Sequence, residues 1–222
     1  MEVVKAGYAK CLADMLVHAM SATITYNGAV TRPQILTLLE TSGPLELKRT
    51  RGVLHARAWG ADYLLWIDSD QTFPPDALLQ LLKHDVPVVG CNYPTRGEPA
   101  LPTALGFDGE DIWTTEAQAR SGELQRVAAL GLGFCLVKVP IFEIIDRQLP
   151  GVRLFQSDIS PAGELITGED VHFFNQVRKA GLPVFLDHGL SWQIGHLAET
   201  ERKNADAVRA AGAVAAAPAR PE

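Results

Sequence analysis

Hydrophobic residues along the chain follow two spacings, and each spacing predicts a different kind of element. Between Tyr8 and Ala19 the apolar side chains recur every three or four residues, which indicates an amphipathic helix. The runs Tyr63–Ile67 and Pro87–Gly90 are instead continuously apolar and short, as in strands that are buried on both faces of a sheet. A leucine-rich helix opened by Pro74 separates them. The pattern therefore predicts a strand–helix–strand unit and an α/β fold.

The same criteria extend this prediction over most of the chain. Further strands are expected at Ala22–Tyr26, Phe134–Val139, Val184–Leu186 and Ser191–Ile194, and further helices at Thr31–Glu40, Leu47–Trp59, Pro140–Arg147 and Glu169–Lys179. We expect one α/β domain over residues 1–203, built on a single mixed, mostly parallel sheet that is flanked by helices. Residues 204–222 are rich in Ala and Pro and are expected to form a disordered tail.

Composition and charge narrow the class of protein. With 47% hydrophobic and 21% charged residues, the chain has the balance of a soluble globular protein. The net charge of -6 argues against a protein that binds nucleic acid by neutralising its phosphates. The 3 cysteines form no CxxC pair, so neither a zinc ribbon nor a disulfide framework is indicated, and a cytoplasmic setting is expected. We expect no signal peptide and no membrane span, since no apolar run approaches roughly 18 to 20 residues.

The first candidate for chemistry is Asp68-Ser69-Asp70, directly after the strand Tyr63–Ile67. In open α/β sheets, ligands bind beyond the carboxyl ends of the strands. Two carboxylates one residue apart form a hard-oxygen site for Mg²⁺ or Mn²⁺, and such an ion would hold a diphosphate on an otherwise acidic protein. The alternative is a polar turn in which the Asp and Ser side chains cap the helix that follows Pro74.

A second acidic pair, Glu169-Asp170, opens a predicted helix. A carboxylate at this position can serve as a general base that deprotonates an acceptor hydroxyl. The segment Thr167-Gly168-Glu169-Asp170 also matches a capping box, and acidic residues in a first turn complement the helix dipole. On this pair alone, capping is the simpler interpretation.

Two further features bear on the same site. His196 follows a late strand and is suited to complete the ligand shell of a Mn²⁺ held by carboxylates, although a surface histidine at the start of the last helix is the simpler interpretation. Basic residues are densest one helix before the acidic triplet, where they can hold a phosphate or form a solvated helix face. These residues are Lys48, Arg49, Arg51 and Arg57.

Taken in order, these motifs resemble those of GT-A fold glycosyltransferases, close to the family 2 type and its bacterial and phage relatives. The similarity runs from about Lys48 to Leu197. Its anchors in chain order are Arg51–Ala58, Gly60–Asp70, Val88–Tyr93 with Arg96, Gly131–Val137, Gly168–Phe174 and Ile194–His196. Each anchor is weak alone, and their shared order carries the resemblance.

The resemblance implies a role for each matching residue. Asp68 and Asp70 would be the DxD pair that holds Mn²⁺ or Mg²⁺ and the nucleotide, with Asp70 as the direct ligand and Asp68 nearer the ribose. His196 would complete the metal shell. Asp170, with Glu169 beside it, would be the catalytic base of an inverting enzyme. The residues implied to lie near the donor, its sugar or the acceptor are Arg51, Tyr93, Arg96 and Gly133.

The reaction that the resemblance implies is the transfer of a sugar from a nucleotide-sugar, a UDP- or GDP-sugar, to an acceptor hydroxyl. The acceptor is unknown, and a glycan, a lipid-linked saccharide or a protein would each supply a hydroxyl. The chain departs from the family pattern in two places. Only Met1-Glu2-Val3-Val4 precedes the first helix, so the opening strand is expected to be short or missing and the start truncated. Gly52 stands where relatives commonly carry Asn.

Two other functions fit parts of the pattern. Asp68-Ser69-Asp70-Gln71-Thr72 also fits the motif of haloacid-dehalogenase-type phosphatases, with Asp68 as nucleophile, Asp70 as acid/base and Glu169-Asp170 as Mg²⁺ ligands. Against it, two helices and a strand precede the motif, and no convincing motif lysine precedes Gly168. The other alternative is a protein that binds a sugar nucleotide without turning it over.

Overall fold

The computed structural model describes residues 4–197, 201–206 and 208–209. Its helices are α1 (Ala6–Ser21), α2 (Leu45–Trp59), α3 (Ala77–Leu82), α4 (Glu116–Ser121), α5 (Pro140–Gln148), α6 (Glu169–Lys179) and α7 (His188–Ser191). Its strands are β1 (Ile24–Tyr26), β2 (Ala29–Thr31), β3 (Tyr63–Ile67), β4 (Gln71–Thr72), β5 (Val88–Gly90), β6 (Ala104–Leu105), β7 (Asp111–Ile112), β8 (Leu124–Val127), β9 (Phe134–Lys138), β10 (Asp158–Ile159), β11 (Leu165–Thr167), β12 (Val184–Asp187), β13 (Gly195–Leu197) and β14 (Glu201–Lys203).

The central sheet has five strands in the order β3-β9-β5-β12-β8. Strands β5 and β12 are parallel neighbours, whereas β9 runs antiparallel to both β3 and β5, and β8 runs antiparallel to β12. The protein is therefore mixed α/β, but the expected mostly parallel sheet is not found. A continuous apolar run indicates that a strand is buried on both faces, but it does not determine the direction of the strand. Strand β9 is buried on both faces and runs antiparallel to its neighbours.

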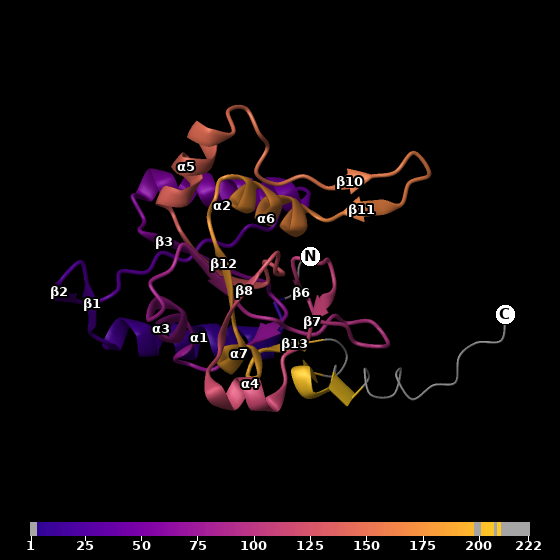
Figure 1. The fold of residues 1–222 in the computed structure, drawn as a ribbon. Coiled ribbons are helices and arrows are strands. Elements are labelled where there is room, and N and C mark those ends of the chain that lie inside the picture. The colour runs from indigo at the N-terminus through magenta and orange to yellow at the C-terminus, as the bar shows by residue number, and fades with distance from the viewer. Residues whose placement is uncertain (1–3, 198–200, 207, 210–222) are drawn as a thin grey trace.

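Helices cover both faces of the central sheet, and the side chains of β9 show how the two layers are filled. Cys135 and Val137 face a core that includes residues of α2, α5 and α6. Phe134 and Leu136, which alternate with them, face a second core that includes residues of α1, α3 and α7. Figure 1 shows α2, α5 and α6 above the sheet and α1, α3 and α7 below it.

Most of the elements expected from the sequence are present, but two are wrong. Residues 32–40 form no helix and continue from β2, which pairs with β1 across the turn Asn27-Gly28. The expected strand Ser191–Ile194 is also absent, because Ser191 ends α7 and the next strand, β13, begins only at Gly195. The helix expected at Glu169–Lys179 is confirmed as α6 with the same bounds.

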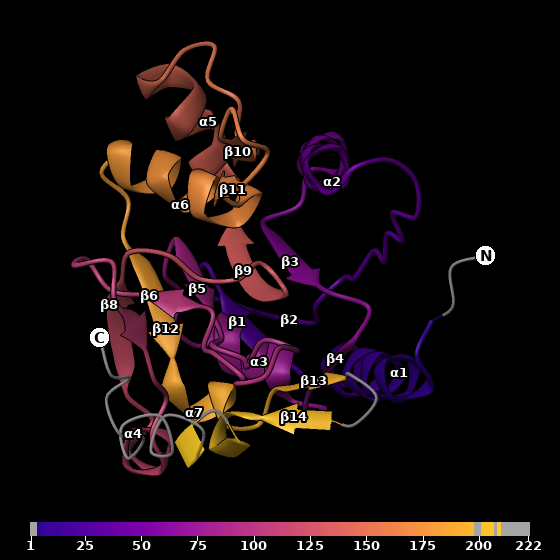
Figure 2. The ribbon, with the colours of Figure 1, turned by 90° about the vertical axis from the view of Figure 1, so that its right-hand side faces the viewer.

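Several strand ends meet at one edge of the sheet. The carboxyl ends of β3, β5 and β12 and the amino end of the antiparallel β9 all point to it. A small three-stranded sheet, in the order β14-β13-β4, lies just beyond β3 and places His196 opposite Gln71 (Figure 2). The chain therefore returns late in the sequence to the segment that follows the first acidic pair.

The end of the described chain packs against this region. Asn204 is buried, and its side-chain amide donates a hydrogen bond to the carbonyl oxygen of Asn92 at 3.1 Å and another to that of Ser191. Packing thus continues into the first residue of the expected tail, whereas residues 207 and 210–222 lie outside the described part of the chain. None of the helices in the described ranges has both the length and the hydropathy that crossing a bilayer requires.

Candidate functional site

Asp70 and His196 lie in contact, although 125 residues (positions 71–195) separate them in the sequence. The Oδ2 atom of Asp70 is 3.3 Å from Nε2 of His196. Backbone pairing between β4 and β13 creates this contact, and the Leu197 amide donates to the carbonyl oxygen of Asp70 at 2.7 Å. The alternative of a surface histidine at the start of the last helix is wrong, because His196 lies on β13 and is only 9% exposed.

The other side of the His196 ring is fixed by the segment that follows β5. Nδ1 lies 2.8 Å from the carbonyl oxygen of Pro94, which can only accept, so Nδ1 carries a proton. The Tyr93 ring packs edge-on against the imidazole at 5.6 Å between centroids. In the neutral ring the Nε2 lone pair therefore faces the Asp70 carboxylate, and two acceptors so close repel unless a cation lies between them.

Asp70 carries its negative charge readily in this setting. Burial alone would raise the pKa of Asp70, but the interaction with His196 and the charges of Arg96 and Lys5 outweigh it, so the pKa lies below its usual value. The guanidinium of Arg96 contributes directly, with Nη1 at 3.2 Å from Asp70 Oδ2. The same carboxylate oxygen thus contacts both an imidazole and a guanidinium.

Asp68 has a different partner, the buried side chain of Arg49. Nη2 of Arg49 donates to Oδ1 of Asp68 at 2.8 Å, and Arg49 is only 6% exposed. Its guanidinium also lies over the ring of Trp66, 6.0 Å from the centroid. The Nε atom of Arg49 is buried and has no hydrogen-bond partner among the described residues. Sequence reasoning included Arg49 only as one member of a basic cluster.

Glu169 and Asp170 lie close enough to Arg49 and Asp68 for the two charges to change their pKa values. Burial and the neighbouring Asp170 charge raise the pKa of Glu169, and burial raises the pKa of Asp170, while Arg49 opposes both shifts and Asp68 adds to both. Arg49 therefore pairs directly with Asp68 and also favours the ionised forms of Glu169 and Asp170. A partly buried carboxyl group with a raised pKa is suited to accept a proton near neutral pH.

The capping box predicted at this helix start is absent. The residue at the N-cap position of α6 is Gly168, which has no side chain to cap with, and Thr167 belongs to β11. Oδ1 of Asp170 accepts from the amide of the next residue, Val171, at 2.7 Å, and so satisfies one donor of the first turn. The predicted capping box is therefore absent, although acids in the first turn still complement the helix dipole.

Gly133 lies between Asp68 and Tyr93 and is bonded to both. The Gly133 amide donates to Oη of Tyr93 at 2.8 Å, and its carbonyl oxygen accepts from the Asp68 amide at 2.9 Å. A methyl group added to Gly133 would lie 2.5 Å from Oη of Tyr93 and 2.9 Å from Oδ2 of Asp68. The glycine is therefore required by the close approach of Tyr93 and Asp68, which sequence reasoning did not foresee.

We expect Gly133→Ala to lower the free energy of unfolding by about 1–3 kcal/mol, because the added methyl group overpacks this contact. The measurement is urea denaturation followed by circular dichroism. Gly97→Ala is the matched control, since the nearest atom to its added methyl group is 3.7 Å away, and it should change stability by less than about 0.5 kcal/mol. Equal stability of the two variants would contradict the packing described for Gly133.

The structure does not bring every residue suggested by the resemblance to this site. Arg51 points elsewhere, donating to the carbonyl oxygen of Ser42 at 3.1 Å and lying 3.6 Å from Glu40. Tyr93 is buried at 6% exposure, so its role is to support His196 and Gly133 in this structure. Arg96, in contrast, is solvent-exposed and contacts Asp70. The roles of Arg51 and Tyr93 in donor binding stay predictions.

The donors present fit a divalent metal ion only in part. A carboxylate oxygen and an imidazole nitrogen are ligands that Mn²⁺ accepts, and the bond between His196 and the Pro94 carbonyl is the outer-shell support typical of metal sites. Within the described ranges, however, no group of three Cys, His, Asp or Glu side chains could hold a metal ion. The predicted three-ligand set is therefore reduced to Asp70 and His196, with Asp68 bound by Arg49.

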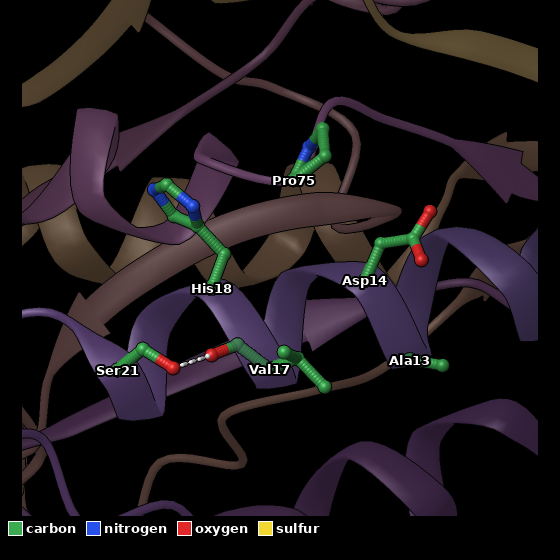
Figure 3. Close-up of a pocket in the computed structure, with 6 residues that line it drawn as sticks. All are labelled: Ala13, Asp14, Val17, His18, Ser21 and Pro75. Atoms are coloured by element: carbon green, nitrogen blue, oxygen red, sulfur yellow. Dashed lines mark hydrogen bonds between the residues drawn. The ribbon is translucent and has the colours of Figure 1, made fainter.

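One surface hollow lies apart from these residues. It is lined by α1 and by the segment before α3, and Figure 3 shows its residues Ala13, Asp14, Val17, His18, Ser21 and Pro75. The Asp14 carboxylate is already paired with Lys10 at 2.5 Å. The hollow contains none of the predicted site residues, and we assign no function to it.

Comparisons with known proteins place the chain only distantly. A scan against protein-family models and a search of curated proteins both find no match. Among solved structures, A197 from STIV is similar with a TM-score of 0.47 and 17% identity, over 73% of this chain and 72% of that one. GalNAc-T7, crystallised with UDP, GalNAc and Mn²⁺, gives 0.43 and 14% over 76% of this chain and 34% of that one.

This chain thus spans about a third of the GalNAc-T7 chain. At this level of similarity, neither structure assigns a fold family or an activity. The class established by the fold is a mixed α/β protein with two linked acidic groups at one sheet edge. The likeness to family 2 glycosyltransferases stays a prediction from the order of the sequence motifs.

Proposed function

We propose that this protein is a metal-dependent glycosyltransferase, which moves a sugar from a nucleotide-sugar to an acceptor hydroxyl. The observation that carries the proposal is the contact between Asp70 and His196, with the nearby Asp68 close enough to Glu169-Asp170 to raise the pKa of both. The motif order implies a metal site for the first group and a catalytic base for the second. The two groups would serve the two halves of the reaction, which are donor binding and acceptor activation.

On the donor side, Asp70 and His196 would hold Mn²⁺ or Mg²⁺, and the donor diphosphate would supply further oxygen ligands. When bound, the ion would neutralise the diphosphate and so stabilise it as a leaving group. Asp68, which is oriented by Arg49, would accept from the ribose hydroxyls of a UDP- or GDP-sugar. Arg96 is the exposed cation nearest Asp70 among the ion pairs described and would contact the diphosphate.

On the acceptor side, Asp170 would take the proton of the attacking hydroxyl. Burial gives the carboxyl group of Asp170 a raised pKa, and Arg49 keeps that shift moderate, so the group can be ionised and still be basic near neutral pH. Glu169 beside it raises the local negative charge. The acceptor itself stays open, and a glycan, a lipid-linked saccharide or a protein would each present a suitable hydroxyl.

The test is a thermal-shift panel of UDP- and GDP-sugars with Mn²⁺ and with EDTA. A donor at about 100 times its Kd should raise the Tm by about 5–10 °C in Mn²⁺, because ligand binding stabilises the folded state by mass action. EDTA should abolish the shift. Asp70→Asn should do the same relative to its own ligand-free Tm, whereas Asp14→Asn on α1 should keep the full shift.

Three results would contradict the proposal in different ways. Equal Tm shifts in Mn²⁺ and in EDTA would show that donor binding does not need a metal ion. Hydrolysis of p-nitrophenyl phosphate, lost in Asp68→Asn, would favour the phosphatase, although the Asp68 carboxylate is already engaged by Arg49 at 2.8 Å. Metal-dependent donor binding without release of nucleoside diphosphate, to water or to any acceptor tried, would indicate a protein that binds the sugar nucleotide without turnover.

A further inference from the structure

Two basic side chains, His196 and Arg96, lie against the same carboxylate oxygen of Asp70. Oδ2 of Asp70 lies 3.3 Å from Nε2 of His196 and 3.2 Å from Nη1 of Arg96. A metal ion bound by Asp70 and His196 would take up this oxygen and the Nε2 lone pair. The Arg96 guanidinium therefore lies where it would compete with the ion for the carboxylate.

The segment that carries Arg96 is anchored on both sides of the residue. Before it, the Pro94 carbonyl accepts from the His196 ring at 2.8 Å. After it, Leu101 is bonded back to Thr95: its carbonyl oxygen accepts from the Thr95 amide at 2.7 Å, and its amide donates to Oγ1 of Thr95 at 3.0 Å. The backbone is thus held in place while the Arg96 side chain is 60% exposed, so the side chain can move without the segment.

We propose that Arg96 is a counter-ion that occupies Asp70 in the donor-free protein and moves to the donor diphosphate when the metal binds. This rests on the proposed function and adds a regulation of the same site. Metal alone must displace Arg96 from Asp70 and leave the guanidinium without a partner. When a diphosphate binds together with the metal, Arg96 pairs with the diphosphate instead. Each ligand therefore raises the affinity for the other.

The consequence is a coupling between metal and nucleotide that depends on Arg96. A diphosphate raises the affinity for the metal in any case, because it supplies ligand oxygens directly. Arg96 adds a second contribution, which disappears when the side chain is removed. Since coupling is reciprocal, the same contribution appears in the affinity for the diphosphate measured with and without metal.

The experiment measures binding of Mn²⁺ by electron paramagnetic resonance, with and without UDP or GDP, in the wild type and in Arg96→Ala. Without nucleotide, Arg96→Ala should bind Mn²⁺ about two- to fivefold more tightly, the size expected for loss of a largely exposed ion pair. With nucleotide this advantage should vanish, so the factor by which the diphosphate tightens Mn²⁺ binding should be smaller in the variant.

Two further variants test the assignment. Arg96→Lys keeps the positive charge and should resemble the wild type. Arg120→Ala removes another exposed arginine, which pairs with Glu116 on α4, and it should leave both affinities unchanged. Their Tm values in EDTA, compared with the wild type, verify that all variants are folded.

The outcomes separate this inference from the proposed function. If the wild type binds Mn²⁺ together with a diphosphate, but Arg96→Ala shows the same affinities and the same coupling, only the role of Arg96 is overturned. If Arg96→Ala binds Mn²⁺ alone more weakly than the wild type, Arg96 supports the metal site and does not compete for it. If no variant binds Mn²⁺ with either nucleotide, the metal site fails and the inference fails with it.

Discussion

Asp170→Asn is expected to lower turnover of the donor by about 10²–10⁴-fold while leaving donor binding intact, because it removes the base and spares the metal side. Asparagine keeps an oxygen that can accept from the Val171 amide, which bonds Oδ1 of Asp170 at 2.7 Å. Turnover is measured as nucleoside diphosphate released from the donor found by thermal shift. Glu164→Gln, in the neighbouring hairpin loop, is the matched control and should keep wild-type turnover.

The expected stability of Asp170→Asn distinguishes a base from a structural acid. The folded protein raises the pKa of Asp170, so its charge opposes folding at neutral pH. The neutral variant should therefore unfold at the same temperature as the wild type or slightly above it. The raised pKa also predicts that wild-type turnover falls on the acid side at a pH above that of an ordinary aspartate. Near wild-type turnover of Asp170→Asn would exclude it as the base, and active variants at both acids would favour a retaining mechanism.

The sequence predicted most helices and central strands because each carries a local signal. Glu169–Lys179 has acids in its first turn and bases in its last, and α6 has these bounds. The helix expected at residues 31–40 fails because only Ile35 of its apolar side chains packs against a core among the described residues. Leu36, Leu38 and Leu39 are 57%, 45% and 60% exposed, and so short a helix is marginal without a buried face.

The second wrong element shows a local bond overriding residue preference. The apolar pattern at Ser191–Ile194 favoured a strand, but the Asp187 carboxylate accepts from the Leu190 amide at 2.8 Å and caps the short helix α7. The direction of β9 was out of reach for a different reason. Burial determines which strands are apolar, whereas direction depends on the connections that precede them.

Residues of the candidate site were named from the sequence where they belong to a motif. They were missed where only the three-dimensional packing brings them together. Asp68, Asp70, Asp170 and His196 stand in recognisable positions along the chain. Arg49 and Arg51 are two residues apart on α2, so they lie on different sides of the helix, and only the packing decides which one reaches Asp68. Gly52, three residues after Arg49, approaches the Trp66 ring, since its added methyl group would lie 3.3 Å from Nε1. Residues three apart share a helix face, so Arg49 faces inward on the same side as Gly52.

Arg49→Met is expected to cost about 1–3 kcal/mol of unfolding free energy at pH 8. Removing one partner of a buried ion pair typically costs about 3–5 kcal/mol, and we expect less here because the Asp68 side chain is 37% exposed and partly solvated. The loss should shrink as the pH falls toward 5. Arg49 opposes the raised pKa of Glu169 and Asp170, so without it both pKa values rise further. A raised folded-state pKa destabilises the protein above that pKa and is relieved by protonation.

The measurement is urea denaturation at pH 8 and pH 5, with Arg57→Met as the matched control on the same helix. Arg57 pairs with Asp146 at 2.6 Å, and their side chains are 30% and 50% exposed, so its loss should cost less than about 1 kcal/mol. That cost should be the same at both pH values, since no buried carboxylate depends on it. An Arg49→Met deficit that is equally large at pH 5 would mean that the arginine acts through its pairing with Asp68 and its packing on Trp66, and not through Glu169 and Asp170. That result would contradict an electrostatic role of Arg49 toward Glu169 and Asp170. It would also remove the link through Arg49 between donor binding and the base.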